Sequence, residues 1–139
     1  MKAKRIDHVV IAVKDLEAAV ATYQQNFGLA QVSGGEVPSL GIRNAFLQIG
    51  DAQLELVTPL ADQGPVADFL ARHGSGMYLL ALEVDNLDEA ITTLQNQGAR
   101  LNVTTGSRGQ RLAFVSPRAT HGVLLQLVET SRGRDVASP

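Results

Sequence analysis

Residues 7–28, DHVVIAVKDLEAAVATYQQNFG, decide the fold, because they contain one strand followed by one helix and because the pattern recurs along the chain. The second copy is YLLALEVDNLDEAITTLQNQG, residues 78–98. In each copy an alternating apolar run, typical of a strand, ends at a residue type that favours the start of a helix. These residues are Asp15 and Asn86, which are 71 positions apart. The spacing indicates a duplicated unit of roughly half the chain.

Both predicted helices have one apolar face. After each capping residue, apolar side chains recur at the i, i+3, i+4 and i+7 positions of a helix that is buried on one side. They are Leu16, Ala19, Val20 and Tyr23 in the first copy and Leu87, Ala90, Ile91 and Leu94 in the second. Gly28 and Gly98 stand where a left-handed residue commonly ends a helix. We therefore expect each helix to pack on one face of a sheet.

The remaining strands follow from apolar runs that are bounded by turn residues. In the first half we expect strands at residues 5–13, 29–33, 42–49 and 52–57, with a loop at 34–41 and a hairpin turn at Gly50-Asp51. In the second half we expect strands at residues 77–84, 101–104, 111–116 and 123–128. A short helix that opens at Pro65 and closes at His73-Gly74 connects the two halves.

Together these elements predict an α+β fold of two tandem β-α-β-β-β modules. Each helix covers one face of its strands, and the other faces are left to form a curved mixed sheet around a central cleft. We assign residues 1–58 to the first module, 59–76 to a connector, 77–129 to the second module and 130–139 to a flexible C-terminal tail.

The composition excludes several classes of protein. The 139 residues suffice for a real core, and they include no cysteine, which removes disulfides and thiolate chemistry. A net charge of −2 and an aromatic share of 4% without tryptophan argue against a nucleic-acid surface. No apolar run approaches the roughly 20 residues that span a bilayer. Because the start MKAKRIDHVV has no signal-type apolar segment, we expect a cytoplasmic protein that binds no membrane.

Two polar residues lie inside apolar strands at the same spacing of 71 positions: Glu55 in AQLELV and Gln126 in VLLQLV. A carboxylate that is buried beside Leu54 and Leu56 needs a metal, a cation or a proton as its partner, although a glutamate on a half-open sheet can also face solvent. His8 is predicted on the face of the first strand that points away from the helix. We expect His8, Glu55 and Gln126 to converge in the cleft.

Four segments resemble the vicinal oxygen chelate superfamily, which includes glyoxalase I, extradiol dioxygenases and bleomycin-binding proteins, and are most similar to its methylmalonyl-CoA epimerases. They are DHVVIAVKDLEAAVATY (7–23), GIRNAFLQIGDAQLELVTPL (41–60), GPVADFLARHGSGMYLLALEVDNLDEAI (64–91) and RGQRLAFVSPRATHGVLLQLVE (108–129). The resemblance implies the paired-module fold, isomerase or lyase chemistry of the epimerase or glyoxalase type, an acyl-CoA substrate and a homodimer.

The resemblance also implies a metal site, with one ligand from the first strand and one from the last strand of each module. The matching positions are His8, Glu55, Leu79 and Gln126, where the epimerases have histidine at the third and usually glutamate at the fourth. Leucine offers no lone pair, and Tyr78 should point to the opposite face of its strand. We expect His8, Glu55 and Gln126 to bind a divalent ion such as cobalt, nickel, manganese or zinc weakly; the alternative is no metal.

Two further positions bear on the chemistry. The epimerases carry an acid/base glutamate in the loop before the third strand, where this chain has Ser39 and Leu40. Arg43 and Arg111 are candidates for contact with an anionic group of a ligand, but a position at a strand edge or a carboxylate partner within the protein is the favoured reading.

Two functions fit these residues. The first is an enzyme that moves a proton next to a carbonyl or thioester, with Glu55 as the general base. The second is a metal-free binding or resistance-type protein of the same fold, which takes a small apolar or acyl ligand without turnover. In either case, the residues predicted to line the cleft are Val10, Ala12, Val57, Leu79 and Ala81.

Overall fold

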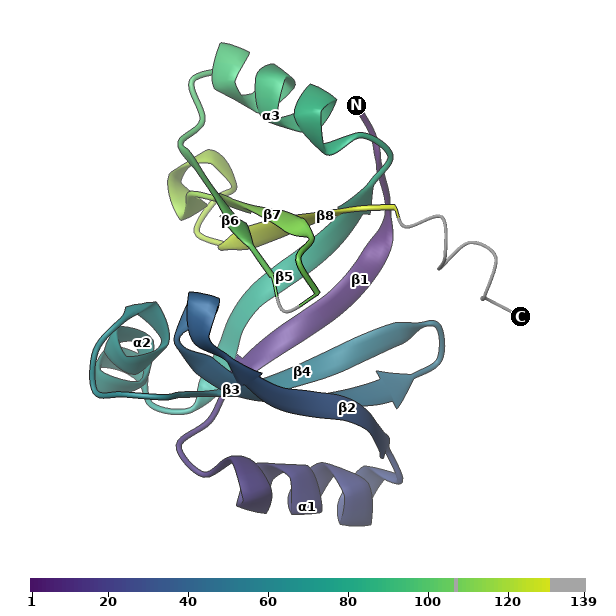
Figure 1. Cartoon of the computed structure of the whole chain (residues 1–139), viewed down its shortest axis with the longest axis vertical. Helices are drawn as coiled ribbons and strands as arrows, with labels where there is room; N and C mark the ends of the chain where they lie inside the picture. Colours follow the sequence, from purple (N-terminus) through teal and green to yellow (C-terminus); the bar gives the residue numbers. More distant parts are fainter. Residues whose placement is uncertain (107, 131–139) are drawn as a thin grey trace. The chain divides into compact units, whose positions relative to one another are not determined.

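The computed structural model describes residues 1–106 and 108–130, and Figure 1 shows the course of the chain. The predicted order of elements is confirmed, since a β-α-β-β-β run is followed by a short helix and a second β-α-β-β-β run. The elements are β1 (Ala3–Ala12), α1 (Leu16–Phe27), β2 (Ala30–Val37), β3 (Ile42–Ile49), β4 (Ala52–Pro59), α2 (Pro65–His73), β5 (Gly76–Val84), α3 (Leu87–Asn96), β6 (Leu101–Thr105), β7 (Arg111–Val115) and β8 (Leu125–Glu129).

The chain forms two compact units. The first is continuous, from His8 to Leu79, and the second combines Met1–Asp7 with the chain from Leu80 onward. Both β1 and β5 therefore contribute residues to both units. The module boundaries at residues 58 and 77 describe the repeat in the sequence and stay a prediction, and of the predicted tail only Thr130 lies within the described residues.

In the first unit, β1 pairs in parallel with β4, and β4, β3 and β2 follow in antiparallel order. Helix α1 covers one face of these strands (Figure 1). The buried core of this unit consists of Val13, Leu16, Ala45, Leu47 and Leu56. Because side chains alternate along a strand, the opposite face carries His8 and Val10 from β1 and Glu55 and Val57 from β4. The predicted direction of His8, away from the helix, is consistent with this arrangement.

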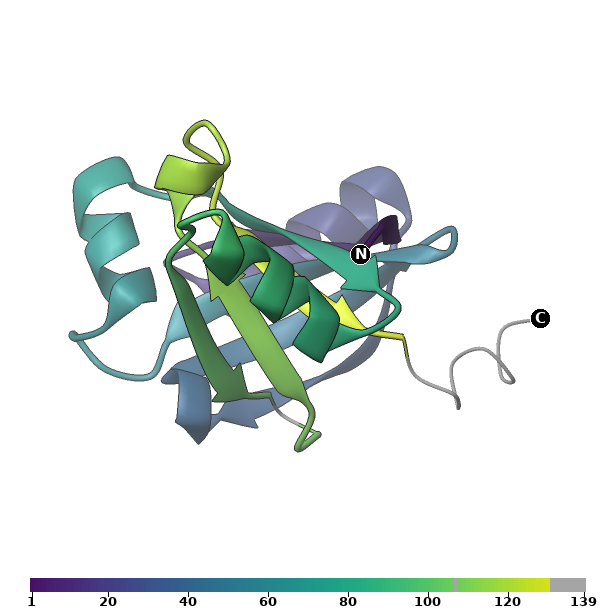
Figure 2. The same ribbon diagram turned by 90° about the horizontal axis from the view of Figure 1, so that it is seen from above.

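The second unit repeats the pattern. Strand β5 pairs in parallel with β8, and β8, β7 and β6 follow in antiparallel order. Helix α3 packs on one face, as the turned view in Figure 2 shows. The core under this helix consists of Val84, Leu87, Ala90, Ala113, Val115 and Leu127. Ala81 and Gln126 are register partners on the face that points away from α3.

The predicted starts of both helices and the predicted end of α1 are confirmed, whereas α3 has Gln97 as its C-cap, with Gly98 following at φ 83°. Asp15 Oδ1 accepts a hydrogen bond from the Ala18 N–H at 3.0 Å, and Asn86 Oδ1 accepts one from the Glu89 N–H at 3.0 Å. Each cap satisfies one of the backbone donors that a first helical turn leaves without a partner in the helix. After α1, Gly28 adopts φ 69°, the left-handed conformation that ends a helix and favours glycine.

The predicted loop at residues 34–41 is wrong in its first half. Strand β2 continues to Val37, and only Pro38–Leu40 leave it, as a single 3₁₀ turn. The glycines suggested a loop, but here Gly34 permits close strand pairing, because a Cβ at this position would lie 2.6 Å from the carbonyl oxygen of Asn44. A bulge between Gln31 and Ser33 adjusts the register ahead of it.

Within residues 1–106 and 108–130, none of the helices has the length and apolar character needed to cross a membrane.

Candidate functional site

The centre of the candidate site is a buried pair of titratable residues, His8 on β1 and Glu55 on β4. The imidazole Nε2 lies 3.2 Å from Glu55 Oε1, and the two residues are only 5% and 7% exposed. Parallel pairing of the strands places Val10 directly opposite Glu55, so the histidine two residues earlier on the same face comes beside the carboxylate. The sequence prediction that these two residues meet is consistent with this geometry.

Asn44 on β3 holds the other oxygen of the carboxylate. Its Nδ2 donates a hydrogen bond to Glu55 Oε2 at 2.9 Å, and its Oδ1 accepts one from the backbone N–H of Gly35 at 3.2 Å. Asn44 is itself only 6% exposed. A hydrogen bond to a charged group contributes about 1.5–3 kcal/mol, so this contact partly offsets the cost of removing the carboxylate from water.

Apolar residues of neighbouring strands adjoin the pair: Val10 and Phe46 are the register partners of Glu55. The ring of Phe46 meets the His8 ring edge to face, with 5.8 Å between the centroids and 80° between the planes. Val10, Ala12, Val57 and Leu79, all predicted to line the cleft, are buried. Leu79 supplies no ligand atom. Tyr78 beside it contacts Phe69 of α2 in a T-shaped arrangement, and burial raises the pKa of its phenol.

Gln126 and Ala81, two further predicted site residues, belong to the second compact unit. Both are buried, and Gln126 lies opposite Ala81 on β5 and Phe114 on β7. Glu55 has an equivalent setting in the first unit, opposite Val10 and Phe46. The repeat therefore extends to the environment of these two polar residues, while the convergence of Gln126 with His8 and Glu55 stays a prediction.

The donor set fits a metal ion only in part. Two ligands at about 2.1 Å from one ion are separated by about 3.0–3.4 Å for right-angled to tetrahedral geometry, which matches the spacing of His8 Nε2 and Glu55 Oε1. Over residues 1–106 and 108–130, however, no group of three or more histidine, cysteine, aspartate or glutamate residues is arranged to hold a metal. The spacing of His8 and Glu55 therefore fits two neighbouring ligands of one ion, and metal binding by these residues stays a prediction.

Arg43 and Arg111 each pair with a carboxylate in the first turn of their own unit's helix. Arg43 binds Glu17 of α1 with two contacts, at 2.7 and 3.1 Å, and Arg111 binds Asp88 of α3 at 2.8 Å. The hydrogen bond from Arg43 holds the pKa of Glu17 below its ordinary value. These pairs lie on the helix side of the strands, and the predicted contact with an anionic ligand stays a prediction.

Some buried polar residues escaped the sequence prediction. Asn44 is one. Side chains alternate along a strand, so Asn44 lies on the same face as Phe46, and this alternation could have indicated that Asn44 belongs to the site. Asp7 and Glu83 are two others. Arg5 donates to Glu83 Oε2 at 3.2 Å and to Asp7 Oδ1 at 3.4 Å, so a partly exposed guanidinium compensates two buried carboxylates in the second unit. The sequence gives no spacing that pairs these residues.

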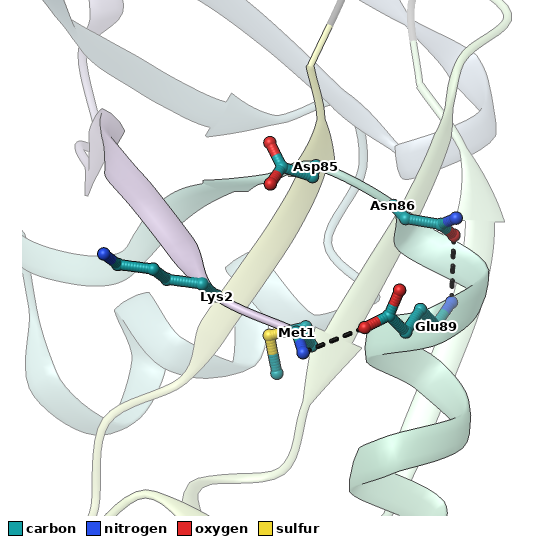
Figure 3. Close-up of a pocket in the computed structure, with 5 residues that line it drawn as sticks. All are labelled: Met1, Lys2, Asp85, Asn86 and Glu89. Atoms are coloured by element: carbon teal, nitrogen blue, oxygen red, sulfur yellow. Dashed lines mark hydrogen bonds and ion pairs between the residues drawn. The ribbon is translucent and has the colours of Figure 1, made fainter.

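Two surface hollows lie away from the His8–Glu55 pair. One, of ≈ 220 Å³, is lined by Met1, Lys2, Asp85, Asn86 and Glu89 (Figure 3), and the N-terminal ammonium group lies 2.9 Å from Glu89 Oε1. The other, of ≈ 330 Å³, lies between α1 and strands β2 and β3. Neither is lined by His8 or Glu55, although Asn44 is among the residues that line the second.

Comparison with known proteins adds independent evidence. The chain is 37% identical over 128 residues to human mitochondrial methylmalonyl-CoA epimerase, covering 88% of this chain and 72% of the relative. The structure of methylmalonyl-CoA epimerase from Mycobacterium tuberculosis superposes with a TM-score of 0.87 at 34% identity, covering 97% and 93% of the two chains. A Streptomyces coelicolor methylmalonyl-CoA epimerase variant, solved in complex with 2-nitronate-propionyl-CoA, gives 0.89 at 30% identity over 94% and 97%.

These similarities confirm the predicted fold class and the likeness to methylmalonyl-CoA epimerases. The family model described as Glyoxalase/Bleomycin resistance protein/Dioxygenase superfamily matches residues 7–114, a segment that contains β4, the later part of β1 and the His8–Glu55 pair. The chain belongs to the glyoxalase/bleomycin resistance protein/dioxygenase superfamily.

Proposed function

We propose that this protein catalyses proton transfer at the carbon next to the thioester carbonyl of an acyl-CoA, as a methylmalonyl-CoA epimerase does. The observation that carries the proposal is the buried Glu55 carboxylate, which lies beside His8 among apolar side chains and is held by Asn44. A carboxylate placed in this way suits the role of general base. The human and Mycobacterium tuberculosis relatives named above support the choice of substrate class.

In the proposed reaction, Glu55 Oε1 removes the proton from the α-carbon. The electron pair of the broken C–H bond moves toward the carbonyl, and the negative charge collects on the thioester oxygen as an enolate. The protonated Glu55 restores the substrate when it returns a proton to the same face of the planar carbon. A proton delivered to the opposite face by a water molecule inverts the configuration, and the hydroxide left behind takes the proton from Glu55. Either outcome exchanges the α-proton with solvent when the base equilibrates with water, so exchange reports the first step directly.

In this scheme the imidazole of His8 stays next to the carboxylate. The edge-to-face contact with Phe46 restricts the orientation of the imidazole ring. A divalent ion, where bound, would be held by His8 and Glu55 with Gln126 as the predicted third ligand, and would supply Lewis-acid polarisation of the thioester carbonyl. Val10 and Val57, the buried register partners of Glu55 and Asn44, exclude water, which strengthens electrostatic interactions at the reacting carbon.

The test is deuterium exchange into the α-position of methylmalonyl-CoA, followed by NMR in heavy water, with wild-type protein purified without an affinity tag. Metal content is measured by elemental analysis on the same sample, and cobalt, nickel, manganese and zinc are then titrated into the metal-depleted protein. We expect enzyme-dependent exchange. Absence of exchange at every metal concentration contradicts the proposed function.

A second candidate is a metal-free binding protein of the same fold. The observation that favours it is Leu79, a buried apolar residue at the position where the resemblance implies a ligand. Saturable binding of an acyl-CoA in equilibrium dialysis, without exchange of its α-proton, is the result that selects this candidate over the enzyme.

We also propose a homodimer, because closed two-fold dimers are the commonest soluble oligomers and the family resemblance favours one. Sedimentation equilibrium over a range of concentrations tests this, and a single species at the mass of one 14.8 kDa chain contradicts it. The cytoplasmic location stays a prediction from the sequence.

A further inference from the structure

We infer that Asn44 is the positioning residue of the site, since it fixes which oxygen of the Glu55 carboxylate is presented for proton transfer; this rests on the proposed function. Asn44 Nδ2 donates to Glu55 Oε2 at 2.9 Å, while Oε1 lies 3.2 Å from His8 Nε2. All three side chains are buried. One carboxylate oxygen is thus committed to the amide, and the other faces the imidazole.

The direction of the hydrogen bonds is determined by the groups at both ends. The backbone N–H of Gly35 can only donate, so the group of Asn44 that faces it, 3.2 Å away, is the oxygen. The amide nitrogen then faces Glu55 Oε2 and donates to it, and a carboxylate that acts as a base can only accept. Both contacts require the same orientation of the Asn44 amide, which therefore cannot flip without losing both.

The backbone of β2 is shaped for this contact. Gly35 lies directly opposite Asn44 in the antiparallel pair of β2 and β3. Its neighbour Gly34 packs so closely on β3 that a Cβ atom would lie 2.6 Å from the Asn44 carbonyl oxygen and 3.2 Å from Ala45 Cα. A larger residue at 34 would push the strands apart and move the Gly35 N–H away from the Asn44 side chain.

The sequence repeat shows that the fold itself does not require an asparagine at this position. Asn44 corresponds to Leu112, 68 positions later, just as Phe46 corresponds to Phe114. In the second module the residue equivalent to Glu55 is Gln126, a neutral amide. The fold therefore accepts leucine at this position of β7, and the amide donor is present only in the module whose strand carries the carboxylate.

Asn44→Leu, which installs the residue of the second module, tests the inference. We expect kcat for α-proton exchange to fall about 10- to 100-fold, the range for residues that orient a reacting group, with KM changed less than about twofold. A purely structural role lowers the thermal midpoint and leaves kcat of the folded protein unchanged. Asn102→Leu, on exposed strand β6, is the matched control and is expected to leave kcat unchanged.

The pair Asn44→Asp and Glu55→Gln gives a second test, which holds even if leucine prevents folding. Asn44→Asp removes the donor and places two carboxylates together, whereas Glu55→Gln removes the negative charge but keeps an amide oxygen that can accept from Asn44 Nδ2. The double variant restores one hydrogen bond with its direction reversed, and the new carboxylate at 44 still accepts from Gly35. We expect the double variant to recover the thermal midpoint lost by Asn44→Asp but not the activity, because the base is absent.

Crystal structures of wild-type protein and Asn44→Leu separate this inference from the proposed function. In the variant we expect the distance between Glu55 Oε1 and His8 Nε2 to increase to more than about 4 Å, which is beyond hydrogen-bond range, while β3 and β4 keep their positions. A carboxylate that keeps its wild-type position overturns the inference, whatever the activity. A carboxylate that moves, in a protein whose wild type shows no exchange, supports positioning by Asn44 and contradicts only the proposed function.

Discussion

The imidazole of His8 and the carboxylate of Glu55 lie 3.2 Å apart on two neighbouring parallel strands, and both side chains are almost completely removed from water. Burial of two titratable groups costs free energy unless each has a partner, and stability alone does not require such a pair. Pairs of this kind are common at sites that transfer protons or bind metals.

Glu55→Gln is expected to reduce the rate of α-proton exchange by about 10²- to 10⁴-fold, because the amide cannot accept a proton as a general base. The measurement is the initial rate of deuterium incorporation into methylmalonyl-CoA. Glu36→Gln, an exposed position on β2, is the matched control and should retain the wild-type rate. Equal rates for Glu55→Gln and wild type would exclude Glu55 as the base.

Tyr78→Phe is expected to make stability less sensitive to alkaline pH. Burial raises the pKa of Tyr78 above its ordinary value of 10.0, so the unfolded chain releases this proton at a lower pH than the folded one. The contribution of the neutral phenol to the free energy of unfolding is fully present below about pH 10, and it is lost as pH rises through the folded-state pKa. Thermal midpoints from pH 7 to 11 should fall more for wild type than for the variant; parallel curves would contradict this.

Arg43→Ala is expected to leave KM for an acyl-CoA within about twofold of wild type, because Arg43 is engaged with Glu17 on the helix side of β3. The pKa of Glu17 is lowered from 4.5, so the ion pair contributes stability above that pH and loses it as pH falls through the folded-state pKa. The variant should therefore lose less stability than wild type on acidification below pH 4.5. Arg111→Ala provides the comparison in the second unit, and a tenfold rise in KM for either variant would establish the anion contact instead.

Much of the fold could be predicted because local signals and the repeat agree. The caps at Asp15 and Asn86, the apolar stripes behind them and the hairpin turn at Gly50 each correspond to observed elements. The prediction failed where one residue type fits two structures. Gly34 was expected in a loop but lies in β2. A glycine marks either a turn or a close approach of two strands, and only the partner strand distinguishes them.

The candidate site could be predicted only in its main residues. His8 and Glu55 were identified because each is a polar residue within an apolar strand, and parallel register brings them together. Asn44 of β3 was missed because its role depends on the Glu55 side chain of β4 and on the backbone N–H of Gly35 in β2. Contacts of this kind have no fixed spacing in the sequence, so the residues that orient a reacting group are harder to predict than the group itself.

Leu79→His combined with Gln126→Glu is expected to create tight metal binding if the four strand positions surround one point. Leu79 is buried and offers no lone pair, and Gln126 is a neutral ligand, so the pair of substitutions adds one imidazole and one negative charge to His8 and Glu55. Four such ligands satisfy a zinc or cobalt ion, whereas two leave most positions to water. Cobalt titration followed by visible absorbance should show one bound ion per chain for the double variant, with far weaker binding for wild type. Addition of His8→Ala should abolish the gain, because it removes one of the four ligands. A double variant that is folded but binds cobalt no better than wild type would show that residues 79 and 126 do not share a site with His8 and Glu55.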